Sequence, residues 1–316
     1  MHRWALLSGI RGGGRRRDRA RERLCFVAGA RHNRVMVDPR SDEEFSTALE
    51  AAQQRIIEHR GYVEKQHCDG IARTIYAVLV PNRDELLALL DQAASDADLA
   101  VELIQNVRRP VVRTRFEGAV MRGLHNYVTS AMTLVEHTRR VMRGRSGPTA
   151  EEFERRKQEV VANPEVPFIQ GLRNYVLHHS LPFVGHQVQL QAQPNVIATS
   201  EIRLSVRELA QWDGWSGSTM SFIESHDEAL TLRPVIRRHS ELVIELNVWL
   251  YGQLADANAD ALAEVNQLVV QRNAILGGLG PDEARRVTEE WTRRREEREP
   301  SGPVDVRSLM GRRQGS

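Results

Sequence analysis

Residues 173–178, Arg-Asn-Tyr-Val-Leu-His, hold the side chains of this sequence whose types and spacing best suit chemistry. On a helix, Asn174 and His178 are four residues apart and share a face, and Arg173 is offset but long enough to reach toward the same cleft. The carbonyl groups of a last helical turn, shortly before Pro182, favour a charged imidazolium at His178. A histidine can serve as general acid or base near neutral pH, while an arginine can hold a phosphate and stabilise charge on its oxygens. The pattern therefore predicts a site for phosphate chemistry.

The pattern is uncommon, although it is short. The sequence contains 42 arginines, because only Lys65 and Lys157 among its 44 basic residues are lysines. With 11 asparagines and 11 histidines in the chain, Arg-Asn-x-x-x-His is expected by chance about 0.05 times. A purely structural role stays open at this point, in which the arginine pairs with a neighbouring carboxylate and the histidine caps helix carbonyls.

Four further side chains could contribute to the same cleft. His125 and Asn126 belong to the long helix that precedes the motif, where they could equally be a satisfied polar pair. Tyr175 lies within the motif and could line the cleft or face the core. His179 adjoins His178 but points about 100° away on a helix, so we expect it to face solvent.

Several other chemistries lack their sequence signatures. There is no G-x-x-x-x-G-K-[ST] phosphate loop and no H-E-x-x-H zinc pair, and residues 214–218 (GWSGS) fail the G-x-S-x-G pattern at its last position. The glycines at 12–14 and 277–280 follow no convincing strand, so a dinucleotide site is not supported. Two cysteines, Cys25 and Cys68, cannot make a disulfide framework or a four-cysteine zinc site. We therefore expect no metal and no cofactor.

Composition narrows the class of protein. The 316 residues carry a formal net charge of only +2, from 44 basic and 42 acidic residues. This balance argues against a broad nucleic-acid-binding surface but leaves room for a small phosphate site. No run of 18 apolar residues exists, so we expect no membrane span, and the apolar stretch 4–10 precedes its arginines, the reverse of a signal peptide. With so few cysteines, a reducing cytoplasm is the simplest location.

The periodicity of apolar residues predicts a mainly α-helical protein. The strongest helix is expected over 112–143, where apolar residues recur at three- and four-residue spacing. Helical periodicity also covers 83–108, about 168–180 around the motif, and much of 219–276. Residues 75–80 are a β-branched and apolar run that could be a short strand or a turn of buried helix.

Two capping boxes are expected to start helices, one after residue 41 and one after residue 149. Ser41 with Glu44, and Thr149 with Glu152, have the spacing at which each side chain satisfies a free backbone N–H group of the other residue.

One segment departs from the helical pattern. Residues 186–193 (HQVQLQAQ) and 201–209 (EIRLSVREL) alternate apolar and polar side chains, and the turn residues 193–195 lie between them, which predicts a β-hairpin. Trp212 and Trp215 follow it. They could stack on bases, but we expect them to anchor the turn after the hairpin to the helical bundle.

Residues 173–178 (RNYVLH) and their surroundings resemble the HEPN superfamily (higher eukaryotes and prokaryotes nucleotide-binding). The segment fits the R-x(4–6)-H motif of that superfamily, with a polar residue after the arginine. The flanking segments LHNYVTSAMTLVEHTRR, LRNYVLHHSLP, WDGWS and ELNVWLYGQL are similar, in this order, to bacterial HEPN-like proteins of unassigned function. The resemblance covers roughly residues 82–255.

The resemblance implies a fold and an activity. HEPN domains are helical bundles that dimerise, and many are metal-independent endoribonucleases. It implies that Arg173 and His178 are catalytic, that Asn174 orients the site, and that two copies of the motif meet across a homodimer interface to cleave RNA. A toxin–antitoxin or phage-defence setting, with an antitoxin or defence partner whose identity is unknown, is implied by the family alone. The long N-terminal region and the hairpin do not belong to a minimal HEPN bundle.

Two other functions stay open. The motif could belong to a non-catalytic helical scaffold that binds RNA or a protein. Alternatively, the arginine-rich N-terminal segment could make the protein a nucleic-acid-binding regulator.

The expected organisation is an HEPN-like helical bundle with an inserted hairpin, flanked by less ordered ends. Met36 is an alternative start to Met1, which would make the upstream residues a mis-assigned extension. The expected segments are a disordered basic N-terminal segment (1–40), a helical segment (41–81), the bundle (82–280) with its hairpin at about 186–208, and a charged tail (281–316) that contains a frayed helix and is otherwise disordered.

Overall fold

The computed structural model describes residues 39–105, 110–182, 184–191 and 197–298. Its architecture is mainly helical, with one small antiparallel sheet of three strands inserted among the helices. The predicted helical class with an inserted hairpin is thus confirmed at this level. Among the described residues, no helix has the length and apolar character needed to cross a membrane.

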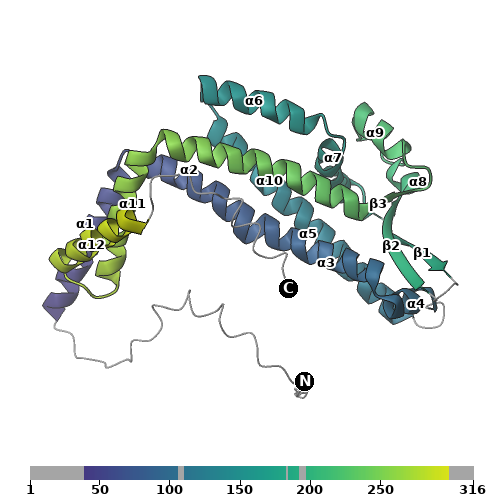
Figure 1. The fold of residues 1–316 in the computed structure, drawn as a ribbon, viewed down its shortest axis with the longest axis horizontal. Helices are drawn as coiled ribbons and strands as arrows, with labels where there is room; N and C mark the ends of the chain where they lie inside the picture. The colour runs from purple at the N-terminus through teal and green to yellow at the C-terminus, as the bar shows by residue number, and fades with distance from the viewer. Residues whose placement is uncertain (1–38, 106–109, 183, 192–196, 299–316) are drawn as a thin grey trace, which may run out of the picture.

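Three long helical segments run side by side through the centre of the molecule (Figure 1). One is a continuous run of α2 (Tyr62–Arg73), the π-helical segment η1 (Thr74–Leu79) and α3 (Val80–Ser95). The others are α5 (Pro110–Met142) and α10 (Leu232–Ala257). Their apolar faces form the main core, because side chains three and four residues apart point to one side of a helix.

The run of apolar residues at 75–80 is helical, and it contains a wider π-helical turn. The Val80 N–H donates to the Ile75 carbonyl, five residues earlier. Pro81 explains the wider turn, since a proline has no N–H to donate and its ring clashes with the carbonyl four residues before it. The boundary that we expected between residues 81 and 82 therefore falls inside one continuous helical run.

The expected helix over 112–143 matches α5 closely. Its predicted apolar stripe is buried, with Val120, Leu124, Tyr127 and Ala131 all at 0–1% exposure. Pro110 starts this helix, as suits a residue that lacks an N–H group.

Both expected capping boxes are wrong. Helix α1 (Pro39–Glu58) already includes Ser41, and α6 (Pro148–Val161) already includes Thr149. At α6 the residue before the helix is Gly147, which has φ of +90° and so adopts a conformation that favours glycine. Proline then supplies the first residue of each helix.

The inserted sheet confirms the predicted hairpin and adds a strand to it. Strands β1 (Val184–Gln191) and β2 (Ile197–Ser205) pair antiparallel, with Val184 opposite Leu204. The turn at 193–195 lies outside the described residues. Residues 206–208, which we expected in the hairpin, belong instead to α8 (Val206–Leu209), where the Ser205 hydroxyl accepts from the Glu208 N–H. Strand β3 (Ala229–Thr231) pairs with the other edge of β2.

The remaining helices extend the bundle at its two ends (Figure 1). Near the sheet lie α4 (Ala97–Gln105) and α9 (Gly217–Glu224), while α7 (Glu165–His178) packs on α5, α9 and α10. At the far end, α11 (Ala259–Leu276) packs between α1 and α12 (Pro281–Arg298) around a separate small core of Ala52, Ile275 and Ala284.

This small core changes the expected organisation of the C-terminal part. Helix α12 occupies much of the segment in which we expected a frayed helix and a disordered tail, and it buries Ala284 completely, so it is packed rather than frayed at that position. The rest of that tail, 299–316, and almost all of the expected basic segment 1–40 lie outside the described residues.

Candidate functional site

The motif lies on α7, the helix that crosses beside α5 and α10. Residues 162–164 separate it from α6, and it ends at His178 with His179 as its C-terminal cap. Leu172 and Tyr175 are buried, whereas Arg173, Asn174 and His178 are exposed. The helical period thus turns all three polar side chains of the motif outward while the apolar face holds the helix on the bundle.

Aromatic packing fixes the position of α7 beneath the motif. The Trp215 ring lies between Phe168 and Tyr175, with ring centroids 5.7 Å from each and interplanar angles of 14° and 20°. Its indole N–H donates to the Leu209 carbonyl over 2.7 Å. Trp212 meets the edge of Tyr175 at 5.7 Å. Both tryptophans therefore anchor the segment after the hairpin to the bundle, as we expected.

Tyr175 does not line a cleft. Its side chain is 1% exposed and packs against the two tryptophans, since its position on α7 faces the core. The Ser180 hydroxyl donates to the Tyr175 phenol oxygen over 3.2 Å, which ties the chain after α7 to the same ring.

Arg173 and Asn174 are in contact. The arginine Nη1 donates to Asn174 Oδ1 over 3.3 Å, so the guanidinium turns toward the side of the helix that carries Asn174. Within the described ranges, Arg173 forms no ion pair and the His178 side chain makes no hydrogen bond. The structural alternative, an arginine held by a carboxylate and a histidine capping carbonyls, is not what this helix shows.

The angular positions of the motif residues around α7 determine which of their side chains can reach the same ligand from one copy of the helix. Asn174 and His178 are one turn apart and share a face, but Arg173 and His178 are about 140° apart around the helix axis. Leu177 lies between them and is 53% exposed, and Leu181 just beyond the helix is 59% exposed. The exposed face thus combines three polar side chains with two apolar ones.

The other expected cleft residues are not brought to the motif. His125 and Asn126 are exposed on α5, on positions about 100° apart around that helix, and no described contact joins either of them to Arg173, Asn174 or His178. His179 is exposed, as expected, with its ring centroid 4.9 Å from that of Tyr175.

The structure also reveals buried polar pairs that the sequence analysis missed. Tyr127 on α5 bonds to His239 on α10, and Thr138 bonds to Asn247 about two to three turns further along the same two helices, with heavy atoms 2.5 Å apart in each pair. The signal that could have found them is a polar residue on an apolar helical face, as at Asn247 within ELNVWL.

Burial changes the acid–base properties of the first pair. Desolvation lowers the pKa of His239 to about 3 and raises the pKa of Tyr127 well above its usual range. His239 is therefore neutral near pH 7 and structural, because it is 2% exposed and has no access to a substrate.

No group of three or more histidine, cysteine, aspartate or glutamate side chains in the described part of the chain is arranged to hold a metal ion. Comparison of the chain with protein-family models, curated proteins and solved structures finds no match.

Proposed function

We propose that this protein is a metal-independent endoribonuclease of the HEPN type, which works as a homodimer. The observation that carries the proposal is the exposure of Arg173, Asn174 and His178 together on α7, while the opposite face of that helix is fixed in the core. A catalytic site needs side chains that are accessible and also held in place by rigid elements.

The chemistry that these side chains suit is attack of a ribose 2′-hydroxyl on the adjacent phosphate. A base removes the 2′-hydroxyl proton, the P–O bond to the 5′ oxygen breaks, and an acid protonates that oxygen, leaving a 2′,3′-cyclic phosphate and a 5′-hydroxyl end. His178 suits the proton transfers. Arg173 suits the phosphate, since its planar guanidinium can donate two hydrogen bonds to phosphate oxygens.

A dimer would overcome the angular separation between the two side chains. With Arg173 and His178 about 140° apart on one helix, a second copy of α7 facing the first supplies a second histidine and a second arginine to one phosphate. The two functions, base and acid, are then divided between the His178 side chains of the two copies. The exposed Leu177 and Leu181 suit such a contact between copies.

The test is cleavage of mixed cellular RNA by the purified protein, with and without EDTA. We expect His178→Ala and Arg173→Ala to lower the rate at least about 100-fold, which is the usual contribution of a general acid or base. His179→Ala is the matched control, because it is the neighbouring exposed histidine, and it should retain activity. Thermal unfolding should show that all three variants remain folded.

Full activity in His178→Ala, or an activity that EDTA abolishes, would contradict the proposal.

The second candidate, a non-catalytic scaffold, is favoured by the exposed leucines alone, since they would serve a protein partner equally well. It predicts that the wild-type protein leaves RNA intact while Leu177 remains necessary for binding a partner.

A further inference from the structure

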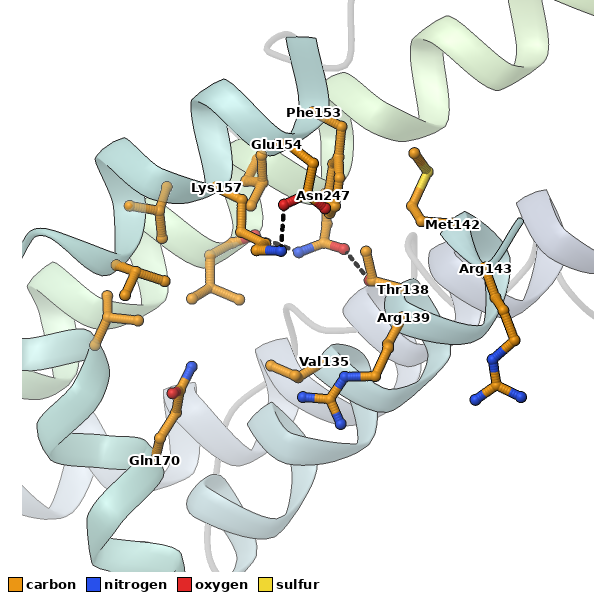
Figure 2. A pocket seen from close by; sticks show the side chains of 15 residues that line it. Val135, Thr138, Arg139, Met142, Arg143, Phe153, Glu154, Lys157, Gln170 and Asn247 are labelled. Carbon is orange, nitrogen blue, oxygen red and sulfur yellow. Dashed lines mark hydrogen bonds and ion pairs between the residues drawn. The ribbon is translucent and has the colours of Figure 1, made fainter. Parts of the chain in front are cut away.

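A cavity opens between α5, α6, α7 and α10, away from the exposed face of the motif (Figure 2). Its volume is about 460 Å³, which is within the range of about 300–1,000 Å³ typical of small-molecule sites. Four helices therefore enclose a space large enough for a ligand.

Most of the cavity wall is apolar, and its deepest polar groups are already paired. Met142, Phe153 and Leu246 are among the apolar side chains that line it. Thr138 and Asn247 also line it, but they are 5% and 3% exposed and bond to each other. The wall thus favours an apolar ligand body and leaves no buried charge for it to neutralise.

Positive charge gathers around the same space. Arg139, Arg143 and Lys157 line the cavity, against a single carboxylate, Glu154. In Figure 2, Arg139 and Lys157 project from different helices toward the open space, and the Gln170 amide points into it from α7. The lining side chains therefore carry more positive than negative charge, which favours an anion over a cation.

The carboxylates that now contact these cations can be replaced. Lys157 pairs with Glu154 and Arg139 pairs with Glu136, both at 2.5 Å, and the four side chains are 46–63% exposed. Exposed pairs of this kind contribute only about 0–1 kcal/mol. A ligand anion that also buries an apolar body can therefore compete for the same two cations.

We propose that this cavity is a binding site for a small amphipathic anion, which places an apolar chain between the four helices and a carboxylate at the rim that Arg139 and Lys157 line. The site is separate from the ribonuclease proposal, and neither depends on the other.

The two lysines of the chain allow a direct test. Reductive ¹³C-methylation labels Lys65, Lys157 and the N-terminal amine while keeping their charges, and Lys65→Arg and Lys157→Arg variants assign the signals. On titration with octanoate, the Lys157 methyl signal should shift and saturate. The Lys65 signal should stay, because Lys65 pairs with Asp69 on α2 and lies outside the cavity.

Three comparisons make the test specific. Octanol, which has the same chain without the charge, should bind about fivefold more weakly, the ratio to which about 1 kcal/mol corresponds. Arg139→Gln should weaken octanoate by a similar factor, while Arg115→Gln, an exposed arginine on the same helix outside the cavity, should not change it. Val161→Trp, at a half-exposed lining position, should block the cavity and abolish the shift.

The proposal is overturned if octanoate leaves the Lys157 signal unmoved, or if octanol binds as tightly as octanoate. It is equally overturned if Arg139→Gln and Arg115→Gln have the same effect, or if Val161→Trp, shown to be folded by its thermal transition, binds octanoate as the wild type does.

Discussion

At the scale of single residues, Tyr127 and His239 form a hydrogen-bonded pair that buries two titratable side chains. The phenol oxygen lies 2.5 Å from His239 Nδ1, and the two rings meet edge to face with centroids 5.7 Å apart. Either atom can be the donor, depending on the tautomer of the imidazole. What keeps His239 neutral is its burial, because desolvation disfavours the charged ring and lowers its pKa.

We expect His239 to make the protein sensitive to acid. Its pKa is about 3 in the folded state and about 6.5 when exposed in the unfolded chain, so the unfolded state binds the proton first as pH falls. Its contribution is complete above about pH 6.5 and is lost progressively toward pH 3, with a decrease in the free energy of unfolding of about 2 kcal/mol between pH 7 and pH 5. Urea unfolding at the two pH values measures this difference.

The matched variants are His239→Gln and His125→Gln. The first removes the buried titrating group and should flatten the pH dependence, whereas the second changes an exposed histidine and should leave it unchanged. An identical pH dependence in His239→Gln and the wild type would show that the acid sensitivity arises elsewhere.

For some residues of the candidate site the amino-acid sequence alone predicts whether the side chain is exposed or buried, and for others it does not. The exposure of Arg173, Asn174 and His178 follows from the helical period alone, because it fixes which side of α7 each residue occupies. The burial of Tyr175 depends on Trp212 and Trp215, which come more than thirty positions later in the chain. A local pattern cannot show which distant ring will cover it.

At the scale of elements, the contact between α7 and the segment after the hairpin is tight at one position. A Cβ added at Gly171 would lie 2.6 and 2.7 Å from two ring carbons of Trp215. Gly171→Ala should therefore lower the free energy of unfolding, by about 1–3 kcal/mol, which is typical of an overpacked core. Chemical denaturation of the variant measures the change.

A glycine in the middle of another helix provides the control. A Cβ at Gly70, within α2, meets nothing within 4 Å, so Gly70→Ala should stabilise the protein by up to about 1 kcal/mol. If both substitutions stabilise the protein, the packing of Trp215 on Gly171 is not as close as the structure shows.

The elements themselves were predictable where one local signal dominates. The apolar stripe of α5 and the alternation in β1 and β2 identify a helix and a hairpin, because their periods of 3.6 and 2 differ clearly. Strand β3 has only three residues and owes its conformation to pairing with β2, so no local period reveals it. The helix starts at Pro39 and Pro148 were missed because serine and threonine one or two positions later imitate a cap.

At the scale of the whole molecule, the chain builds two cores of very different size. The helix α2, which we expected in a separate N-terminal segment, contributes Cys68 and Ile71 to the main core. Helix α11, which we expected in the bundle, packs Leu262 against the main core and also shares the small core with α1 and α12. Sequence order alone could not show this, since α1 and α11 are brought together by the fold from positions about two hundred residues apart.

Two apolar side chains beside the motif are exposed at the face where a second copy of the chain would bind. Leu177 and Leu181 are more than half exposed beside the motif, and the proposed ribonuclease requires a second copy of the chain at this face. We expect Leu177→Glu and Leu181→Glu each to convert a dimer to a monomer in sedimentation equilibrium, because each would bury a carboxylate in an apolar contact. RNA cleavage should fall with the loss of the dimer, although both variants keep Arg173 and His178.

The control for this prediction is Val63→Glu. Val63 is 54% exposed on α2, so the substitution makes the same change of charge at another exposed apolar position and should leave both the dimer and the cleavage unaffected. A wild-type protein that is monomeric at the concentrations where it cleaves RNA would refute the two-copy site. Cleavage would then have to come from one α7, whose Arg173 and His178 point about 140° apart around its axis.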